Sequence, residues 1–297
     1  MNLVVKNIYS DSTIWNAVNA RKTDIIIASC YKAGTTLTQQ IVNLLINGNS
    51  EFSGYSTLQE LSPWVEHTPD PLFASLEEKI DHIEKLPEPR FLKTHLPFDA
   101  LPYHPEWKYI YLVRDGRDVA LSLYNHNAGY DPAFWDVKLE DSFLEFWDNW
   151  LETGRHLWPL WDHIDSWLQV RDRPNILLIH YANLIGDKEN EIARIAEFLG
   201  VKMDAAKKEI VIQQSSLEYM KEYADKFAPP GFIPKAFFGK GKNGVWKDLL
   251  TAEKLEKYET FIIGKLGIEC ANWVKNGGSL PPLLEKTLAE AVERDIK

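Results

Sequence analysis

The chain has 297 residues, a length that fits one large α/β domain or at most two domains. Hydrophobic residues make up 45% and charged residues 26%, which is ordinary for a globular protein. The formal net charge of -10 argues against general binding to nucleic acid or anionic membranes, so any anion site must be a local cluster of donors.

Strand-like and helix-like patterns alternate along the chain. The predicted strands are residues 24–29, 90–94, 108–113 and 175–179, and the predicted helices are residues 35–46, 75–85, 117–126, 141–158 and 188–199. This alternation predicts an α/β fold with a mostly parallel central sheet flanked by helices on both faces. We expect one domain over residues 1–297, with 278–297 as an additional helical tail. Residues 228–247, rich in Gly, Pro and Lys, favour a functional loop or lid.

The loop after the first predicted strand has the composition of an anion site. It carries Lys32, Gly34, Thr35 and Thr36, and a helical pattern follows directly. Glycine lets the backbone turn closely, and amides at a helix N-terminus are unpaired donors that suit an anion. An ordinary turn in which the threonines only cap the helix explains the same residues. The segment alone leaves both interpretations open.

Polar residues also follow the second and third predicted strands. His95 leaves the second strand beside the candidate anion site, where a general base would be useful. Arg114 follows the third strand and is placed to bind an anion bidentately. Ser122 lies eight residues later, about two helical turns, and so on nearly the same face. Asp118 between them is expected on a solvated, charged turn capped by Asp115.

The cysteine and histidine content bears on disulfides, metal binding and cellular location. Only Cys30 and Cys270 are present, so we expect no disulfide framework and a reducing, cytoplasmic location. No Cys or His spacing matches a zinc site, so no metal is expected. We also expect neither a membrane-spanning helix nor a secretory signal.

Taken together, these segments resemble the cytosolic-type sulfotransferases, which use 3'-phosphoadenosine 5'-phosphosulfate (PAPS). The matching segments, in family order, are residues 32–36, 93–97, 114–122, 181, 215–220 and 240–247. The resemblance implies a P-loop-like nucleotide-binding core and in-line transfer of a sulfuryl group from PAPS to a hydroxyl or amine of a small molecule. The products would be PAP and a sulfate ester, and no metal would be required.

The resemblance also implies residue roles. Lys32 would hold the 5'-phosphosulfate and stabilise charge on the bridging oxygen, Lys93 would stand beside the transferring group, and His95 would take the acceptor proton. The implied catalytic residues are His95, Lys32, Lys93 and Ser122. The implied nucleotide-binding residues are Lys32, Ala33, Gly34, Thr35, Thr36, Arg114, Ser122, Tyr181, Ser215, Leu217, Phe238, Gly239, Lys240 and Gly241.

Two departures from the family pattern affect the expected nucleotide contacts. Leu37 stands where the family has Trp, which removes a stacking surface for adenine. Gly239 stands where the family has Arg before Lys240, which removes one expected contact to the 3'-phosphate.

The acceptor is expected on the far side of His95 from the nucleotide. The candidate pocket residues are Trp64, His67, Tyr130, Phe134, Trp135 and Phe232, although aromatic residues of an α/β protein are often core. A family dimer segment is partly matched by Lys247, Thr251 and Glu256, with Ala252 replacing Val, and predicts a homodimer. A helix start capped by Thr251 explains these residues equally.

Two alternative functions stay open. A P-loop nucleotide kinase-like phosphotransferase would share the fold, but the loop lacks the Gly-Lys-Ser/Thr ending of that class. A non-catalytic PAP-binding module would bind nucleotide and form no product, and the presence of both Lys32 and His95 argues against it. A Cys-dependent phosphatase is excluded because Thr36, not Arg, lies six residues after Cys30.

Overall fold

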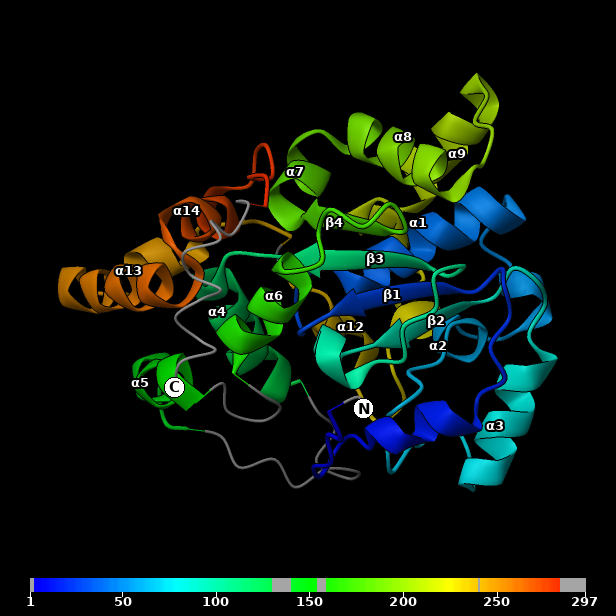
Figure 1. Cartoon of the computed structure of the whole chain (residues 1–297), viewed down its shortest axis with the longest axis horizontal. Helices are drawn as coiled ribbons and strands as arrows, with labels where there is room; N and C mark the ends of the chain where they lie inside the picture. The colour runs from blue at the N-terminus through cyan, green and yellow to red at the C-terminus, as the bar shows by residue number, and fades with distance from the viewer. Residues whose placement is uncertain (1–2, 130–139, 154–158, 240, 284–297) are drawn as a thin grey trace, which may run out of the picture.

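The computed structural model describes residues 3–129, 140–153, 159–239 and 241–283. Its centre is a four-stranded parallel sheet with the strand order β2-β1-β3-β4 (Figure 1). The strands are β1 Ile25–Ser29, β2 Phe91–Thr94, β3 Lys108–Val113 and β4 Ile176–His180. These strands fall within one residue of the predicted ones, because runs of β-branched and aromatic residues favour buried strands.

Helices connect the strands and cover both faces of the sheet. The α-helices are α1 Thr35–Asn47, α2 Leu58–Leu61, α3 Leu76–Lys85, α4 Gly116–Asn127, α5 Phe143–Thr153, α6 Leu160–Leu168, α7 Tyr181–Gly186, α8 Lys188–Leu199, α9 Ala205–Gln214, α10 Leu217–Glu222, α11 Ala224–Phe227, α12 Pro234–Phe237, α13 Ala252–Leu266 and α14 Ile268–Asn276. The 3-10 helices are η1 Ser12–Ala17, η2 Phe52–Gly54, η3 Phe98–Ala100 and η4 Val245–Asp248. The predicted α/β class is therefore confirmed.

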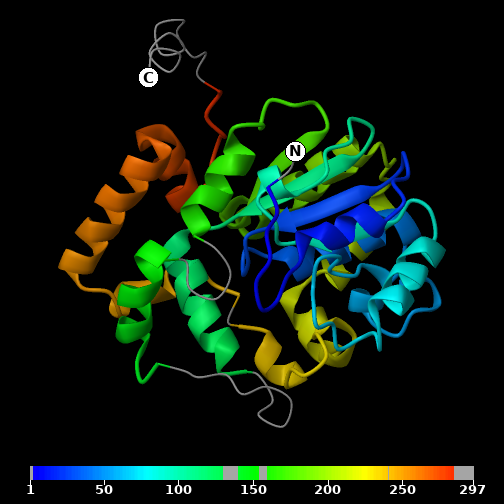
Figure 2. The ribbon, with the colours of Figure 1, turned by 60° about the horizontal axis from the view of Figure 1, so that its bottom comes forward.

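Alternate residues of β1 face two separate apolar clusters. Ile25 and Ile27 pack with residues of α1, α8 and α9, whereas Ile26 and Ala28 pack on the opposite face with residues of α4 and α6. This alternation follows from the two-residue period of a strand. Figure 1 shows α8 and α9 on one side of the sheet and α4 and α6 on the other. Figure 2 shows α13 and α14 as a pair of helices beside α6.

Tryptophan residues concentrate in the cluster on the α4 and α6 side. Its members include Trp15, Trp107, Trp147, Trp150, Trp161, Trp167, Trp246 and Trp273. Most of the 11 tryptophans are therefore core residues. Among the described tryptophans, Trp64 differs because it lines a cavity.

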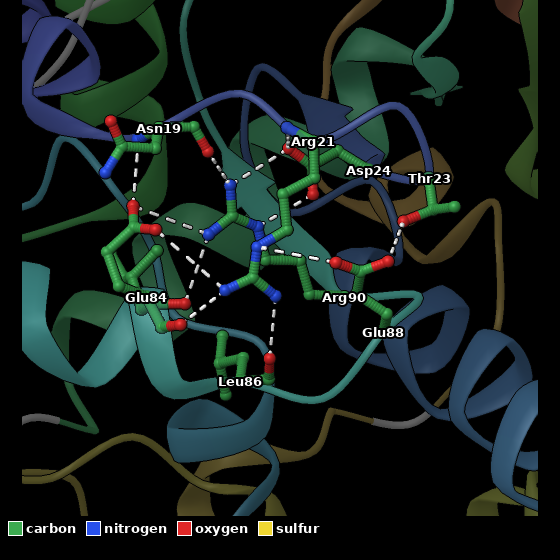
Figure 3. A network of polar contacts seen from close by, with 9 residues as sticks. Asn19, Arg21, Thr23, Asp24, Glu84, Leu86, Glu88 and Arg90 are labelled. Atoms are coloured by element: carbon green, nitrogen blue, oxygen red, sulfur yellow. Dashed lines mark hydrogen bonds and ion pairs between the residues drawn. The ribbon is translucent and has the colours of Figure 1, made fainter.

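A buried ion pair holds the amino-terminal ends of β1 and β2 together. Arg90 Nε donates to Asp24 Oδ1 at 2.7 Å, and Arg90 Nη2 donates to Asp24 Oδ2 at 3.0 Å. Both side chains are fully buried. Figure 3 shows the surrounding network, in which Arg21 donates to the Leu86 carbonyl and pairs with Glu84 at 3.9 Å. This network lies at the opposite end of the strands from their carboxyl ends.

Two predicted helices extend beyond what the structure describes. The helix predicted over 141–158 is present as α5, and residues 154–158 lie outside the described residues. In the predicted C-terminal tail, residues 278–283 are not helical, and residues 284–297 lie outside the described residues. Within the described ranges, no helix has the length and apolar character needed to cross a membrane.

Candidate active site

The carboxyl ends of three neighbouring strands bring predicted polar residues to one cavity. β1 leads into Lys32, β2 into His95 and β3 into Arg114. All three residues line a cavity of about 1290 Å³. The prediction of an enzyme site required an ammonium, an imidazole and a guanidinium to share one cavity. The structure shows that they do.

The loop between β1 and α1 needs a glycine. Gly34 is the N-cap of α1 and has a φ of 102°. This backbone conformation is strained for any residue that carries a side chain. A Cβ atom at this position would lie 2.7 Å from Cδ2 of Tyr181. Gly34, Thr35 and Thr36 line the cavity at the start of α1, where the first amides of a helix have no intrahelical acceptor. The turn therefore presents donors of the kind that bind anions.

Lys32 lies in a cationic part of the cavity. Burial, together with the positive charges of Lys93 and Arg114, lowers the pKa of Lys32 to about 7. The Nζ atom lies 2.9 Å from Nδ1 of His126. An ammonium group can only donate, so the neutral His126 ring accepts this hydrogen bond when Lys32 is charged.

The geometry around His95 identifies its tautomer. Nδ1 lies 2.8 Å from the carbonyl oxygen of Ser29, and because a carbonyl can only accept, Nδ1 carries the proton. Burial, with help from the charge of Lys93, holds the pKa of His95 well below its usual value, so the ring is neutral at pH 7. Nε2 therefore carries a free lone pair, which is the state that a general base requires.

Glu66 holds the backbone of the candidate base. Its Oε1 accepts hydrogen bonds from the His95 amide at 2.6 Å and from Thr94 Oγ1 at 3.0 Å. The same carboxylate accepts from the indole nitrogens of Trp64 and Trp15. Glu66 is completely buried, and burial raises its pKa. Glu66 therefore supports the backbone beneath His95, a role that the local sequence does not indicate.

The Trp64 ring lies close to His95, His67 and the Lys93 ammonium. It stacks on His67 with ring centroids 4.3 Å apart, and its ring meets that of His95 edge-on at 4.7 Å. The Lys93 ammonium lies 5.0 Å from the Trp64 centroid. Burial lowers the pKa of Lys93 to about 8, against the opposing effect of the Glu66 charge. Trp64, His67 and Phe232, the described candidates for the acceptor pocket, all line the cavity.

Helix α4 presents a polar face to the cavity. Asp118, Ser122 and His126 are spaced by four residues, so they lie on one face of the helix, and all three line the cavity. Arg114, just before the helix, donates to the Lys32 carbonyl at 3.2 Å. Its guanidinium also lies 4.4 Å from the Tyr181 ring centroid. Arg114 and Ser122 thus both line the cavity.

The expectation that Asp118 is solvated is wrong. The side chain is only 3% exposed and accepts the Gly244 amide at 2.9 Å. Burial raises the pKa of Asp118 to about 6, although the Arg114 charge partly opposes this. A contact from a segment so distant in sequence could not be read from the local charge pattern. Asp115 does cap α4, accepting the Arg117 amide.

The remaining predicted nucleotide residues are mostly gathered in the same cavity. Its lining includes Tyr181, Ser215, Leu217, Phe238, Gly239 and Gly241. Ala33 instead buries its side chain in the apolar cluster on the α1 side, so only its backbone could serve a ligand. Lys240, Tyr130, Phe134 and Trp135 lie outside the described residues. Over the described part of the chain, no group of three or more His, Cys, Asp or Glu residues could hold a metal ion.

Comparison with known proteins identifies the family. A sequence model of the sulfotransferase domain matches residues 22–268, which is most of the chain. The chain belongs to the sulfotransferase family. The prediction of a sulfotransferase, made from the motifs, is therefore confirmed, and it is favoured over the kinase alternative.

This sulfotransferase has similar proteins of known class and structure. Human (Homo sapiens) sulfotransferase 1C2 is 29% identical over 258 residues, which cover 81% of this chain and 82% of that protein. The crystal structure of mouse sulfotransferase SULT7A1 complexed with PAP has a TM-score of 0.74 at 20% identity, covering 92% of this chain and 98% of that one, and shows the shared fold. Retinol dehydratase in a complex with retinol and PAP has a TM-score of 0.69 at 25% identity, with coverage of 91% and 86%.

Proposed function

We propose that this sulfotransferase transfers the sulfuryl group of PAPS to a hydroxyl group, or an amine, of a small-molecule acceptor, giving PAP and a sulfate ester. The observation that carries the proposal is the meeting of Lys32, His95 and Arg114 in one cavity. PAPS supplies the activated sulfuryl group. The chain supplies positive charge, orientation and a proton acceptor.

The cavity suits an anionic nucleotide. Lys32, Lys93 and Arg114 bring three cations together in a protein whose formal net charge is -10. Gly34 lets Tyr181 pack directly against the loop, because a Cβ there would lie 2.7 Å from Cδ2 of Tyr181, and the loop thereby keeps the turn that brings the first amides of α1 to the cavity. We assign the 5'-phosphosulfate to Lys32 and residues Ala33, Gly34, Thr35 and Thr36, the 3'-phosphate to Arg114, Ser122, Gly239, Lys240 and Gly241, and the adenosine to Tyr181, Ser215, Leu217 and Phe238.

His95 would accept the proton of the acceptor hydroxyl at Nε2. This role is supported by the Ser29 carbonyl, which keeps the other nitrogen protonated. The Lys32 ammonium would stabilise charge that develops on the leaving oxygen, and Lys93 would stand beside the transferring group. A sulfuryl group carries one negative charge fewer than a phosphoryl group, so these cations have less charge to neutralise.

The acceptor would lie against Trp64, His67 and Phe232, on the His95 side of the cavity. Apolar Leu72 and Pro230 also line the cavity. A mixture of flat apolar surface and a few polar groups is typical of sites for small amphipathic molecules. The departures at Leu37 and Gly239 lie in the lining too, and we expect them to weaken adenine and 3'-phosphate contacts.

The direct test is sulfation by the purified protein. Sulfur-labelled PAPS with a panel of phenols, sterols, flavonoids and aliphatic alcohols should give a labelled ester. His95→Ala should lower kcat by roughly 10²- to 10⁴-fold while leaving the affinity for PAP nearly intact. Stronger thermal protection by ATP with magnesium than by PAPS would favour the kinase. PAP binding without product from any acceptor would favour the non-catalytic module.

A homodimer through residues Lys247–Glu256 and a cytoplasmic location stay predictions, as does the extent of the domain over residues 1–297. Thr251 is the N-cap of α13, accepting the Lys254 amide, so capping accounts for this residue without a partner. Lys247 and Glu256 are exposed. Sedimentation of the parent and of Thr251→Glu would test the dimer, since a charge at the centre of the segment should shift a dimer toward monomer.

A further inference from the structure

We propose that His126 is a positioning residue that orients the Lys32 side chain for its work on the donor, an inference that rests on the role given to Lys32 above. The two residues are 94 positions apart in sequence, and His126 is outside every motif that identified the family. Their contact joins the β1 loop to the last turn of α4.

The surroundings of Lys32 explain why its side chain needs such a partner. Lys93 and Arg114 repel its ammonium, and the backbone of Lys32 itself has a φ of 51°. An ammonium on a four-carbon stem has three donors and many rotamers. The 2.9 Å contact with His126 Nδ1 fixes one donor, which leaves the other two to face the cavity.

A neutral imidazole suits this task better than a carboxylate. Burial holds the pKa of His126 well below its usual value, so its ring is uncharged and accepts a hydrogen bond without adding charge. A carboxylate at this point would cancel the Lys32 charge and repel an anionic donor. His126 therefore restrains the ammonium while leaving its positive charge for the ligand.

The ring of His126 is itself held in place from the loop side of the cavity. Phe232 stacks on it with centroids 4.2 Å apart and planes 25° apart, and Phe237 meets it edge-on at 6.0 Å. Phe237 also lies 5.3 Å from the Lys32 ammonium. Near Phe232, the Ile233 amide donates to the Gly129 carbonyl at 3.3 Å. Phe232 and Phe237 therefore hold the His126 ring in place, and this ring in turn holds the Lys32 side chain.

Two substitutions distinguish the contribution of the His126 Nδ1 acceptor from that of its aromatic ring. His126→Phe keeps an aromatic side chain for Phe232 but removes the acceptor, whereas His126→Asn places an amide oxygen near the position of Nδ1. With saturating PAPS, His126→Phe should lower kcat roughly 10- to 100-fold. The KM for PAPS should change by about three-fold or less, because the contact orients a charge needed in the transition state. His126→Asn should regain most of the lost kcat.

His104→Phe is the matched control, because His104 packs on Trp107 at 4.2 Å and does not line the cavity. It should leave kcat unchanged. If His126→Phe did not fold, His126→Leu carries the same prediction. A parent-like kcat in either variant would overturn the proposal, as would an equal loss in His126→Asn, since the ring rather than the nitrogen would then matter.

A double-mutant cycle with Lys32→Ala tests whether His126 acts through Lys32. In the Lys32→Ala background, His126→Phe should cause no further loss of kcat. Additive losses would overturn the proposal. If the parent forms no sulfated product, the proposed function fails, whereas an active parent with an unaffected His126→Phe variant refutes only the positioning role.

Discussion

Asp118 and Gly244 are joined across 126 positions of sequence by a carboxylate that accepts one backbone amide at 2.9 and 3.2 Å. Gly244 has a φ of 78° and is the N-cap of η4. Arg114 reaches the same loop, donating to Asn243 Oδ1 at 3.2 Å. The start of α4 therefore anchors the late loop that borders the cavity.

Asp118→Asn should make stability less dependent on pH. The pKa of Asp118 is raised from 3.8 to about 6, so the folded protein holds this proton more tightly than the unfolded chain. Its contribution to stability is full below about pH 4 and is lost as the pH rises through about 6, by at most about 3 kcal/mol. The Asn variant, which keeps an acceptor, should gain in Tm relative to the parent from pH 4 to 7.5.

Thermal unfolding of both proteins across this range measures the effect. Asp225→Asn, at an exposed position of α11, is the matched control and should show a constant difference from the parent. A constant difference for Asp118→Asn as well would contradict the prediction.

Lys32→Arg should abolish the fall in kcat/KM for PAPS that we expect on the alkaline side of the pH profile. The pKa of Lys32 is lowered to about 7, mainly by burial, and the ammonium form is the one that attracts an anionic donor. The parent's kcat/KM for PAPS should therefore fall as the pH rises through about 7. Arginine stays charged, so its profile should be flat there, at a lower level because a guanidinium does not reproduce a compact ammonium. The same fall in both proteins would assign it to another group.

Arg114→Ala should weaken PAP binding by roughly 1.5–3 kcal/mol, because it removes charge-assisted hydrogen bonds. Arg114→Lys should recover only part of this, since a lysine keeps the charge but loses the fork and the stack on Tyr181. Calorimetric titration with PAP measures both. Arg173→Ala is the control: its guanidinium also lies 4.4 Å from a tyrosine ring, that of Tyr103, away from the cavity. A parent-like affinity in Arg114→Ala would remove Arg114 from the site.

Asp24→Ala should destabilise the fold by about 3–5 kcal/mol, because it leaves the buried Arg90 charge without its partner. Asp81→Ala, which removes the exposed partner of Lys85, should cost about 1 kcal/mol or less. Urea unfolding measures both. The specific activity of folded Asp24→Ala should match the parent, and a loss of kcat in fully folded protein would contradict the separation of the two ends of the sheet.

The strands and the motif residues could be predicted from sequence because their signals are local. A short β-branched run such as Ile25–Ile27, followed by a loop with a glycine, favours a strand, and the rule that ligands bind at strand carboxyl ends then places Lys32, His95 and Arg114 together. Helices such as α6 and α14 were not predicted. For α6 a local signal was present, because its buried apolar residues Trp161, Ile164 and Leu168 recur at helical spacing.

The supporting residues could not be predicted because their partners are distant in the chain. Glu66 is 29 positions from His95, and only folding shows that its carboxylate accepts the His95 amide. The roles of Asp118 and His126 likewise depend on partners from other elements. A local signal did exist: together with Ser122 they repeat every four residues, and three polar residues in such register on a helix that opens beside Arg114 indicate a polar face.

The buried pair of Asp24 and Arg90 has a consequence for engineering. β1 is five residues long, so about 3.3 Å per residue puts roughly 15 Å between that pair and the reactive groups. The two ends share no hydrogen-bond partner in the described contacts, so changes at one end should add to changes at the other. Thermal stability and acceptor specificity can then be optimised in separate libraries of variants, and the best substitutions from each can be combined.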